Sequence, residues 1–493
     1  MSNEIMIENI RKAQKEIELK KEMVRQGKMR QGYHFMPETG WLNDPNGLIY
    51  FQGKYHFFYQ LNPYYGFWDY MHWGHAVSSD MLHWEYLPIA LAPSESYDDY
   101  YRGGCFSGSA IEHDGKLYLI FTTATAGKNG VVQTQSIAWS EDGINFKKYE
   151  GNPVLKAPSG IKESDFRDPK VWKNNDKFYM VCGAKKDNKA QALLYRSNNL
   201  IDWEFVNVLA ESRGELGYMW ECPDFYKLGN KYILTFSPMG AGERKNIYLI
   251  GDFDYNTGKF DYHSLGELDW GLDYYAPHSF VAPDKRRIVV SWANGWDWME
   301  HWKDWGPTYK EGWCGFFNVP REVKLLDNYK LQFIPIKELK ELRTSKSSTE
   351  SMLISTKQEI ALKDGVFFEM KFSINLVESN ASRFEIRLRA HANKSLKYIF
   401  GLKKAELIVD RNKVDDWSKG VSKSVLFLKD KEKLDIHIYS DNSSVEIFTD
   451  NYTNNHSTNI YATKEQNRVY FDTLNGSIKI ENLEIYTLKN VYI

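Results

Sequence analysis

Residues 43–59 read NDPNGLIYFQGKYHFFY and contain the pattern that later segments of the chain repeat. The segment consists of short aromatic and β-branched runs interrupted by Gly, Asn and Asp, with a turn at Gly53-Lys54. Such runs are typical of strands, and the interrupting residues are typical of the turns between them. Because no clear helical period follows Tyr33 for roughly 300 residues, the sequence predicts an all-β body.

The turn followed by a strand occurs five times, at intervals of about 54 to 62 residues. A repeat of this length with several short strands and no helix fits one blade of a β-propeller. A solenoid is the alternative, but its repeats are usually shorter and need capping units, which a closed ring does not. The sequence therefore predicts a five-bladed β-propeller. The turns are Gly53-Lys54, Gly115-Lys116, Asp176-Lys177, Asn230-Lys231 and Asp284-Lys285.

The two ends of the chain depart from this repeat. Met6, Ile10, Ala13 and Ile17 stand at helical spacing among charges, which predicts one short N-terminal helix packed on the body. From about Ser345 apolar and polar residues alternate, which predicts a C-terminal β-sandwich. The predicted organisation is an N-terminal helical segment (1–32), a propeller domain (33–335), a connecting helix or turn (331–344) and a sandwich domain (345–493).

The composition excludes several classes of protein. With 42% hydrophobic and 26% charged residues among 493, the chain matches ordinary globular proteins, not disordered or fibrous ones. The 63 basic and 65 acidic residues leave no net field for a nucleic acid or an anionic membrane. No uncharged apolar stretch approaches the ~18 residues of a membrane span, and residues 1–30 show no secretory signal, so we expect a cytoplasmic protein with reduced cysteines.

Short polar triplets stand at the same place near the start of each repeat. Because the first strand of each blade lines the axis of a propeller, we expect the triplets to surround one funnel where Asp44, Asp168 and Glu221 converge. One motif alone would indicate a turn or a structural ion pair, but burying three acids together costs free energy and indicates a function. The triplets are Asn43-Asp44-Pro45, Phe106-Ser107-Gly108, Arg167-Asp168-Pro169, Glu221-Cys222-Pro223 and Tyr275-Ala276-Pro277.

Converging carboxylates suit glycoside hydrolysis. That reaction uses one carboxylate at the anomeric carbon and one carboxylic acid that protonates the leaving oxygen, roles that Asp44 and Glu221 fit. The apolar neighbours of Glu221 in the sequence are expected to favour its protonated form. Arg167, which directly precedes Asp168, is expected to keep that carboxyl group ionised.

Four motifs together resemble the signature of glycoside hydrolase family 32: WLNDPNG (41–47), FSGS (106–109), FRDP (166–169) and WECP (220–223). The resemblance covers almost the whole chain and implies a five-bladed propeller followed by a sandwich. It implies that Asp44 is the nucleophile, Glu221 the acid/base and Asp168 the transition-state stabiliser, with retention of configuration and about 5 to 5.5 Å between the carboxyl groups of Asp44 and Glu221. It implies no metal or organic cofactor. The implied sugar contacts are Asn43, Gln60, Trp68, Phe106, Ser107, Arg167, Asp273, Tyr275 and Trp292.

The sequence thus predicts a β-fructofuranosidase that releases fructose from the non-reducing end of sucrose, sucrose 6-phosphate or short fructo-oligosaccharides. The alternatives are a fructosyltransferase, an arabinan- or xylan-cleaving enzyme on a related propeller, and a non-catalytic sugar-binding propeller. The expected partner is a small sugar, with no nucleic acid and no membrane, and the sandwich could supply the surface of a homodimer.

Two further features leave a choice between functional and structural roles. Four tryptophans crowd the segment before Pro320, where the chain departs from the pattern usual in the family, and they could stack on a glucose or fructose unit or fill the last blade. His72 and His75 favour hydrogen bonding over metal ligation, because no partner ligands stand at a recognised spacing. The tryptophans are Trp296, Trp298, Trp302 and Trp305.

Overall fold

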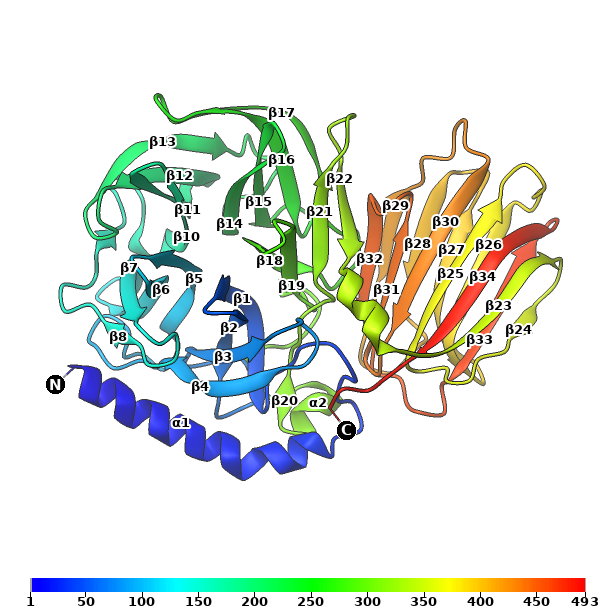
Figure 1. Cartoon of the computed structure of the whole chain (residues 1–493), viewed down its shortest axis with the longest axis horizontal. Coiled ribbons are helices and arrows are strands. Elements are labelled where there is room, and N and C mark those ends of the chain that lie inside the picture. The colour runs from blue at the N-terminus through cyan, green and yellow to red at the C-terminus, as the bar shows by residue number, and fades with distance from the viewer. Residues whose placement is uncertain (1, 493) are drawn as a thin grey trace.

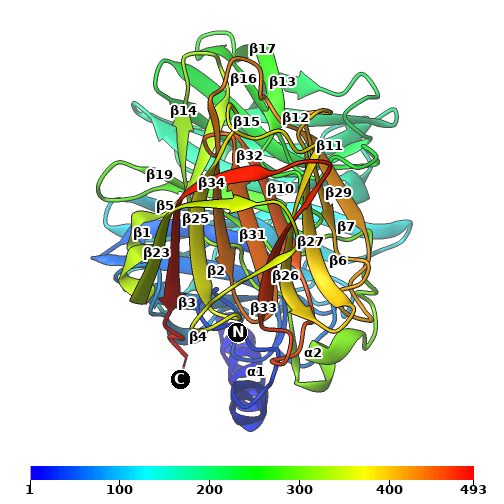
Figure 2. The same ribbon diagram turned by 90° about the vertical axis from the view of Figure 1, so that its right-hand side faces the viewer.

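The structure is a computed structural model that describes residues 2–492. A ring of sheets lies beside a body of two layered sheets, and helix α1 (Ser2–Arg25) runs along the edge of the ring (Figure 1). After a quarter turn the two-sheet body lies in front of the ring (Figure 2). The predicted all-β architecture of a propeller, a sandwich and an N-terminal helix is confirmed.

Helix α1 is held against the propeller by one apolar face. Met6, Ala13 and Ile17 are buried at the predicted spacing and belong to apolar clusters of the propeller. The side chain of Asn9 donates a hydrogen bond to the carbonyl of Pro93 at 2.8 Å, next to the rim of the first blade. The helix therefore packs on the body, as its amphipathic pattern predicts.

Among residues 2–492, five sheets form the ring, one for each predicted blade. The innermost strands β1, β5, β10, β14 and β18 contact one another in that order, and β18 contacts β1, so the ring is closed. The blades are β1 (Gly40–Phe51), β2 (Lys54–Asn62), β3 (His72–Ser78) and β4 (Glu85–Leu91); β5 (Gly104–His113), β6 (Lys116–Gly127), β7 (Gly130–Ser140), β8 (Lys147–Lys148) and β9 (Leu155–Lys156); β10 (Phe166–Asn174), β11 (Lys177–Lys186), β12 (Lys189–Ser197) and β13 (Trp203–Glu211); β14 (Met219–Leu228), β15 (Lys231–Met239), β16 (Ile247–Asp254) and β17 (Lys259–Glu267); and β18 (Tyr275–Val281), β19 (Arg287–Trp292), β21 (Arg321–Leu325) and β22 (Leu331–Pro335).

The fifth blade is interrupted by a long excursion. Residues 293–320 separate β19 from β21 and contain α2 (Gly306–Lys310) and the two-residue strand β20 (Trp313–Cys314). Strand β20 pairs in parallel with β1, with Trp313 opposite Gly40. The excursion therefore ties the last blade to the first.

The segment 331–344 is not simply a connecting helix or turn, and that part of the prediction is wrong. Residues Leu331–Pro335 form the outer strand β22, which pairs with β21, and only Lys337–Leu342 form a short 3₁₀ helix. Leu331 and Phe333 are buried at the two-residue spacing of a strand. A strand of five residues is too short for this period to stand out in the sequence.

The residues described beyond the 3₁₀ helix form two six-stranded sheets. Their facing sides build one apolar cluster that includes Phe384, Ile386 and Leu388 from one sheet and Ile436 and Ile438 from the other. The alternation that predicts a sandwich is thus confirmed. In spatial order the first sheet is β23 (Arg343–Ile354), β34 (Ile478–Leu488), β25 (Phe368–Asn375), β30 (Lys433–Ser440), β31 (Ser444–Thr449) and β32 (Asn454–Asn459), and the second is β24 (Gln358–Ile360), β33 (Arg468–Leu474), β26 (Arg383–His391), β27 (Lys394–Gly401), β28 (Glu406–Asp410) and β29 (Val421–Val425).

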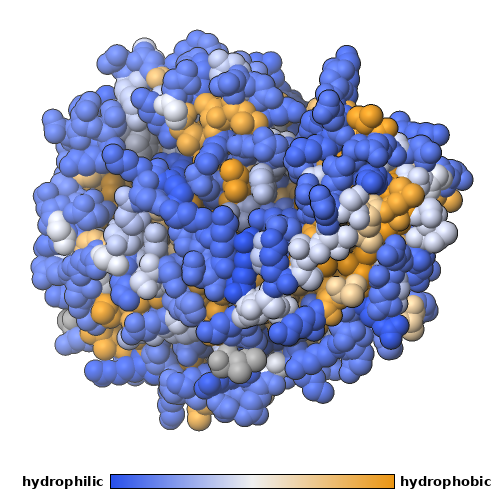
Figure 3. Space-filling model, turned by 45° about the vertical axis from the view of Figure 1, so that its right-hand side comes forward, coloured by the Kyte–Doolittle hydropathy of each residue, from blue (hydrophilic) through white to orange (hydrophobic). Residues whose placement is uncertain are grey.

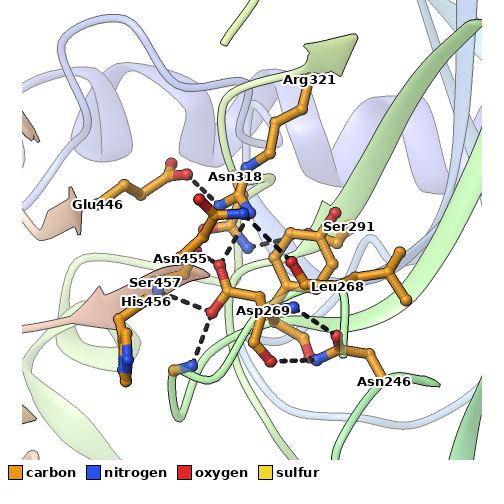
Figure 4. A network of polar contacts seen from close by, with 12 residues as sticks. Asn246, Leu268, Asp269, Ser291, Asn318, Arg321, Glu446, Asn455, His456 and Ser457 are labelled. Carbon is orange, nitrogen blue, oxygen red and sulfur yellow. Dashed lines mark hydrogen bonds and ion pairs between the residues drawn. The ribbon is translucent and has the colours of Figure 1, made fainter. Parts of the chain in front are cut away.

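A buried polar network joins the propeller to the sandwich (Figure 4). Asp269 of the propeller accepts hydrogen bonds from the backbone N–H of Ser457 at 2.9 Å and from Arg321 at 2.8 Å. Arg321 also pairs with Glu446 of the sandwich at 2.5 Å. Removing one partner of such a buried pair leaves an uncompensated charge in the interior, so each member of the network depends on the others.

The outer surface matches the balanced composition. On the face drawn in Figure 3 hydrophilic residues prevail, and hydrophobic residues gather in separate patches. Within residues 2–492, no helix combines the length and the apolar character that crossing a membrane would need.

Candidate active site

The polar triplets reach the axis because each innermost strand is irregular at the same place. In all five blades the pairing of the first two strands shifts register at the triplet, as at a β-bulge. Asp168, Cys222 and Ala276 adopt left-handed backbone conformations there, with φ of 63°, 49° and 49°. Bulges re-aim side chains, and left-handed non-glycine residues cluster at functional sites. The sequence repeat thus places a bulge at the axis in every blade.

Two adjoining cavities open where the triplets meet. The inner cavity has a volume of about 290 Å³ and is lined by Asp44, Asp168 and Glu221. The outer cavity has a volume of about 750 Å³ and is lined by aromatic and charged residues, among them Tyr100 and Lys185. Glu221 lines both, so a scissile bond beside it would have one sugar unit in each cavity. The residues shared by the two cavities are Trp68, Phe106, Arg167, Glu221, Met239 and Trp302.

Asp44 is a buried residue of the inner cavity wall. Its Oδ2 accepts hydrogen bonds from the hydroxyl of Ser107 at 2.6 Å and from the thiol of Cys222 at 3.4 Å. Its Oδ1 is buried and has no hydrogen-bond partner within residues 2–492. Burial raises the pKa of Asp44 to about 6, although the hydrogen bond from Ser107 opposes this. Ser107 and Cys222 thus both bind the same oxygen of the Asp44 carboxyl group.

Asp168 is held by one backbone group and one side-chain hydroxyl of the neighbouring blades. Its Oδ2 accepts a hydrogen bond from the backbone N–H of Cys222 at 2.9 Å, and its own N–H donates to the hydroxyl of Thr122 at 2.8 Å. Burial raises the pKa of Asp168 to about 7 despite the opposing charge of Arg167. Arg167 lowers the pKa of Asp168, as the sequence predicts, but desolvation has the larger effect, so the net shift is upward.

Arg167 instead binds Glu221. Its Nε and Nη2 donate to Oε1 of Glu221 at 3.1 and 3.0 Å, and the hydroxyl of Tyr275 donates to Oε2 at 2.6 Å. Trp220, an apolar neighbour in the sequence, faces away and stacks on Phe236. The expected apolar setting of Glu221 is therefore wrong, since adjacent side chains on a strand point in opposite directions.

Six of the nine sugar contacts implied by the sequence line the inner cavity. The amide oxygen of Asn43 accepts a hydrogen bond from Trp41 at 2.8 Å, and the amide of Gln60 donates to the carbonyl of Cys105 at 2.8 Å. These bonds orient both amides before any ligand enters. The six residues are Asn43, Gln60, Trp68, Phe106, Ser107 and Arg167.

The other three lie behind this wall. Tyr275 binds Glu221, as described above. Trp292 is fully buried and packs against Trp296, with 4.7 Å between ring centroids. Asp273 lies at the junction with the sandwich, where its Oδ2 accepts a hydrogen bond from Arg411 at 2.6 Å. None of the three is among the residues that line the inner cavity, and their implied contact with a sugar stays a prediction.

Four residues that the sequence does not assign also line the inner cavity. Three of them come from the tryptophan-rich segment, and two of these three are tryptophans, so part of the segment lines the cavity. Trp298 and Trp305 of the same segment pack instead on residues of the sandwich. The density of tryptophans was a signal for the segment, whereas nothing in the sequence singled out the methionine. The four residues are Met239, Trp296, His301 and Trp302.

The two histidines of the first blade are hydrogen-bonded within the protein, as predicted. Nδ1 of His72 donates to the carbonyl of Tyr70 at 2.8 Å, and Nε2 of His75 lies 3.0 Å from Nδ1 of His56. Burial lowers the pKa of His72 to about 4, so its ring is neutral at physiological pH.

Comparisons with known proteins agree with this geometry. Family models for the N-terminal and C-terminal domains of glycosyl hydrolases family 32 match residues 34–335 and 338–487. A sucrose-6-phosphate hydrolase from Zymomonas mobilis subsp. mobilis is 36% identical over 489 residues, covering 93% of this chain and 92% of its own. A raffinose invertase from Escherichia coli is 37% identical over 458 residues, covering 90% and 92%.

Solved structures extend the agreement to three dimensions. A Bombyx mori beta-fructofuranosidase, solved as a mutant in complex with sucrose, has a TM-score of 0.83 at 31% identity and covers 98% of both chains. A sucrose-6-phosphate hydrolase from Lactobacillus gasseri has a TM-score of 0.85 at 26% identity, covering 97% of this chain and 96% of its own.

A propeller axis that brings an aspartate and a glutamate to one small cavity defines the class of the protein as a glycoside hydrolase. The two family models together extend over nearly the whole chain. The chain belongs to glycosyl hydrolases family 32.

Proposed function

We propose that the chain is a retaining β-fructofuranosidase that releases fructose from the non-reducing end of sucrose, sucrose 6-phosphate or short fructo-oligosaccharides. The named relatives support this substrate class, since the similarity extends over 90 to 93% of this chain. The observation that carries the mechanism is the buried, unpartnered Oδ1 of Asp44, judged over residues 2–492, in a cavity shared with Glu221. The inner cavity would hold the fructosyl unit and the outer cavity the leaving sugar.

In the first step, Oδ1 of Asp44 attacks C2 of the fructosyl unit as the bond from C2 to the leaving oxygen breaks. Glu221 gives its proton to that oxygen, so the leaving sugar departs as a neutral alcohol and Glu221 becomes a carboxylate. Asp168 supports the fructosyl unit by hydrogen bonding to its hydroxyl groups while positive charge develops on the ring.

In the second step, water attacks C2 of the fructosyl–Asp44 ester. Glu221 accepts the proton of this water, and the bond from C2 to Asp44 breaks, which restores both carboxyl groups. Two inversions at C2 give net retention. Arg167 and Tyr275 keep the side chain of Glu221 in one orientation through both steps, by the three hydrogen bonds of 2.6 to 3.1 Å already described.

Fructose release by the purified chain tests this proposal. We expect turnover of sucrose, sucrose 6-phosphate or 1-kestose, and a loss of several orders of magnitude in kcat for Asp44→Asn and for Glu221→Gln. Asp176→Asn, which changes an exposed carboxylate in a turn of the third blade, is the matched control and should retain the wild-type rate. Wild-type turnover by the Asp44→Asn variant would overturn the assigned nucleophile.

Product analysis separates the alternatives. Hydrolysis of sucrose gives glucose and fructose in equal amounts, whereas a fructosyltransferase would give longer oligosaccharides and a deficit of free fructose. A non-catalytic sugar-binding propeller would release no fructose, and its affinity for sucrose would be the same with aspartate or asparagine at position 44.

A further inference from the structure

The tryptophan segment, residues 293–312, has its first anchor on the propeller. Trp296 packs against Trp292 with 4.7 Å between ring centroids and against Trp41 with 6.2 Å. These partners belong to the last and the first blade, and both are fully buried. The start of the segment is therefore packed on the propeller close to Asp44 in the inner cavity, and Asn459 of the sandwich also donates a hydrogen bond to Asn294 at 2.8 Å.

A second anchor is Arg411 of the sandwich. Its guanidinium lies 4.2 Å from the ring centroid of Trp298, within the range of a cation–π contact. The same group donates to Asp273 of the propeller at 2.6 Å and to the carbonyl of Asn459 at 3.0 Å. Arg411 thus fixes Trp298 against both domains at once.

A third anchor is an aromatic contact on the same side. Trp305 meets Trp417 of the sandwich edge to face, with 5.6 Å between ring centroids, and Tyr461 at 6.1 Å. Trp417 is 40% exposed, so replacing it changes this contact without opening the core of the sandwich.

Between these anchors the segment reaches the passage from the inner to the outer cavity. His301 lines the inner cavity and Trp302 lines both. The carbonyl of His301 accepts a hydrogen bond from the backbone N–H of Trp68 at 2.7 Å, and Trp302 packs edge to face on Trp68 at 4.7 Å. Because Glu221 also lines both cavities, Trp302 lies where the leaving sugar would begin.

We propose that the sandwich sets the affinity for the leaving sugar through the tryptophan segment, with Trp417 and Arg411 as positioning residues. The inference rests on the proposed fructosidase function and adds a role for the second domain. Trp302 itself packs on Trp68 of the propeller, and the tryptophans on either side of it in the chain, Trp298 and Trp305, pack on the sandwich. The wall beside the leaving sugar is therefore supported by the sandwich, whereas Asp44 and Asp168 of the inner cavity come from strands β1 and β10 of the propeller.

The variant Trp417→Ala tests this division. We expect the KM for sucrose to rise by roughly twofold to tenfold, the effect of losing one aromatic contact, with kcat close to the wild-type value. Inhibition by glucose, the leaving sugar, should weaken by a similar factor, while inhibition by fructose stays unchanged. Trp417→Phe keeps an aromatic ring, so its KM for sucrose should lie close to the wild-type value.

The matched control is Leu353→Ala, which removes an exposed apolar side chain from β23 of the sandwich. A KM for sucrose in Trp417→Ala equal to that of this control overturns the inference and leaves the proposed function intact. Equal weakening of glucose and fructose inhibition also overturns it, because that result indicates a general loosening of the fold. Trp305→Leu removes the same contact from the propeller side. It should likewise weaken inhibition by glucose and leave inhibition by fructose unchanged. A wild-type chain that releases no fructose overturns both proposals.

Discussion

At the scale of single residues, burial governs the electrostatics of the site. Asp44 and Asp168 are each buried in the propeller, and desolvation raises their pKa values to about 6 and about 7. Cys222 connects them, with its thiol on Asp44 and its backbone N–H on Asp168. The guanidinium of Arg167 pairs with the carboxyl group of Glu221 through two hydrogen bonds. The three carboxyl groups thus have three different environments, as groups with different roles require.

The raised pKa of Asp44 predicts the acid limb of the pH profile. As a nucleophile Asp44 must be ionised, so kcat/KM should fall about tenfold per pH unit below a midpoint near pH 6. The hydrogen bond from Ser107 lowers this pKa, and Ser107→Ala should move the midpoint to higher pH. An acid limb with its midpoint near pH 4, or an unchanged midpoint in Ser107→Ala, would contradict the assignment of this limb to Asp44.

The raised pKa of Asp168 predicts that its charge lowers the stability of the fold although the charge is needed for activity. Its pKa is raised from 3.8 to about 7, so the charge opposes folding increasingly as the pH rises through this range. At pH 8 the charge of Asp168 costs at most about 4 kcal/mol of the free energy of unfolding, so Asp168→Asn should unfold at a temperature a few degrees higher than the wild type. At pH 4 the variant should show little gain in unfolding temperature.

The same Asp168→Asn variant should lose most of its activity, because the neutral amide cannot stabilise developing positive charge. Thermal unfolding at both pH values measures the effect, with Asp176→Asn as the exposed control. An equal shift at pH 4 and pH 8 would rule out the charge as its cause.

At the scale of strands, a glycine permits the close approach of two blades behind the site. A Cβ on Gly183 in β11 would lie 2.0 Å from the carbonyl oxygen of Trp220 in β14. Gly183 also pairs with Arg167 across the strands of the third blade. The backbone next to Glu221 and the residue that binds Glu221 therefore both depend on this one position.

Gly183→Ala should displace Trp220 and the adjoining Glu221. Because the obstacle is backbone, we expect kcat to fall at least about tenfold, together with a lower unfolding temperature. Kinetics with sucrose and thermal unfolding measure both effects. Gly53→Asn is the control: this hairpin glycine has a φ of 83°, a Cβ added to it would meet no atom within 4 Å among residues 2–492, and asparagine tolerates such a conformation. Unchanged kinetics in Gly183→Ala would show that β14 adjusts without moving Glu221.

At the scale of the whole molecule, His34 ties the start of the propeller to the sandwich. Its Nδ1 lies 2.7 Å from Asp441 and its Nε2 lies 3.0 Å from Glu446. Although burial alone would disfavour the charged ring, these two hydrogen bonds raise the pKa of His34 to about 9. The ring is therefore charged at neutral pH and bridges two carboxylates of the sandwich.

His34→Gln should lower the unfolding temperature, and the sign of its pH dependence is fixed by the raised pKa. The stabilisation, of about 3 kcal/mol, is fully present below pH 6.5 and is lost as the pH rises through about 9. The difference between wild type and variant should therefore narrow between these pH values. His263→Gln, at an exposed position in β17, serves as the control. A difference that widens with rising pH would contradict the charged state of His34.

Local patterns along the chain were enough to predict the repeat and the convergence of the carboxylates. The turns from Gly53-Lys54 onward, the alternation in the sandwich and the spacing of Met6 and Ala13 each depend on neighbours a few residues away. The sequence predicts that Asp44 and Glu221 lie close together because they occupy the same position in different copies of one repeat.

The partners of individual side chains arose only in the folded molecule. Arg167 binds Glu221, 54 residues away, although Asp168 adjoins it, and Arg411 binds Asp273, 138 residues away. A charged side chain pairs with whatever packing brings within reach, and desolvation depends on every element around it. The repeat therefore determined which residues meet at the axis, whereas the packing of blades and domains determined their charges, their partners and the residues that line the two cavities.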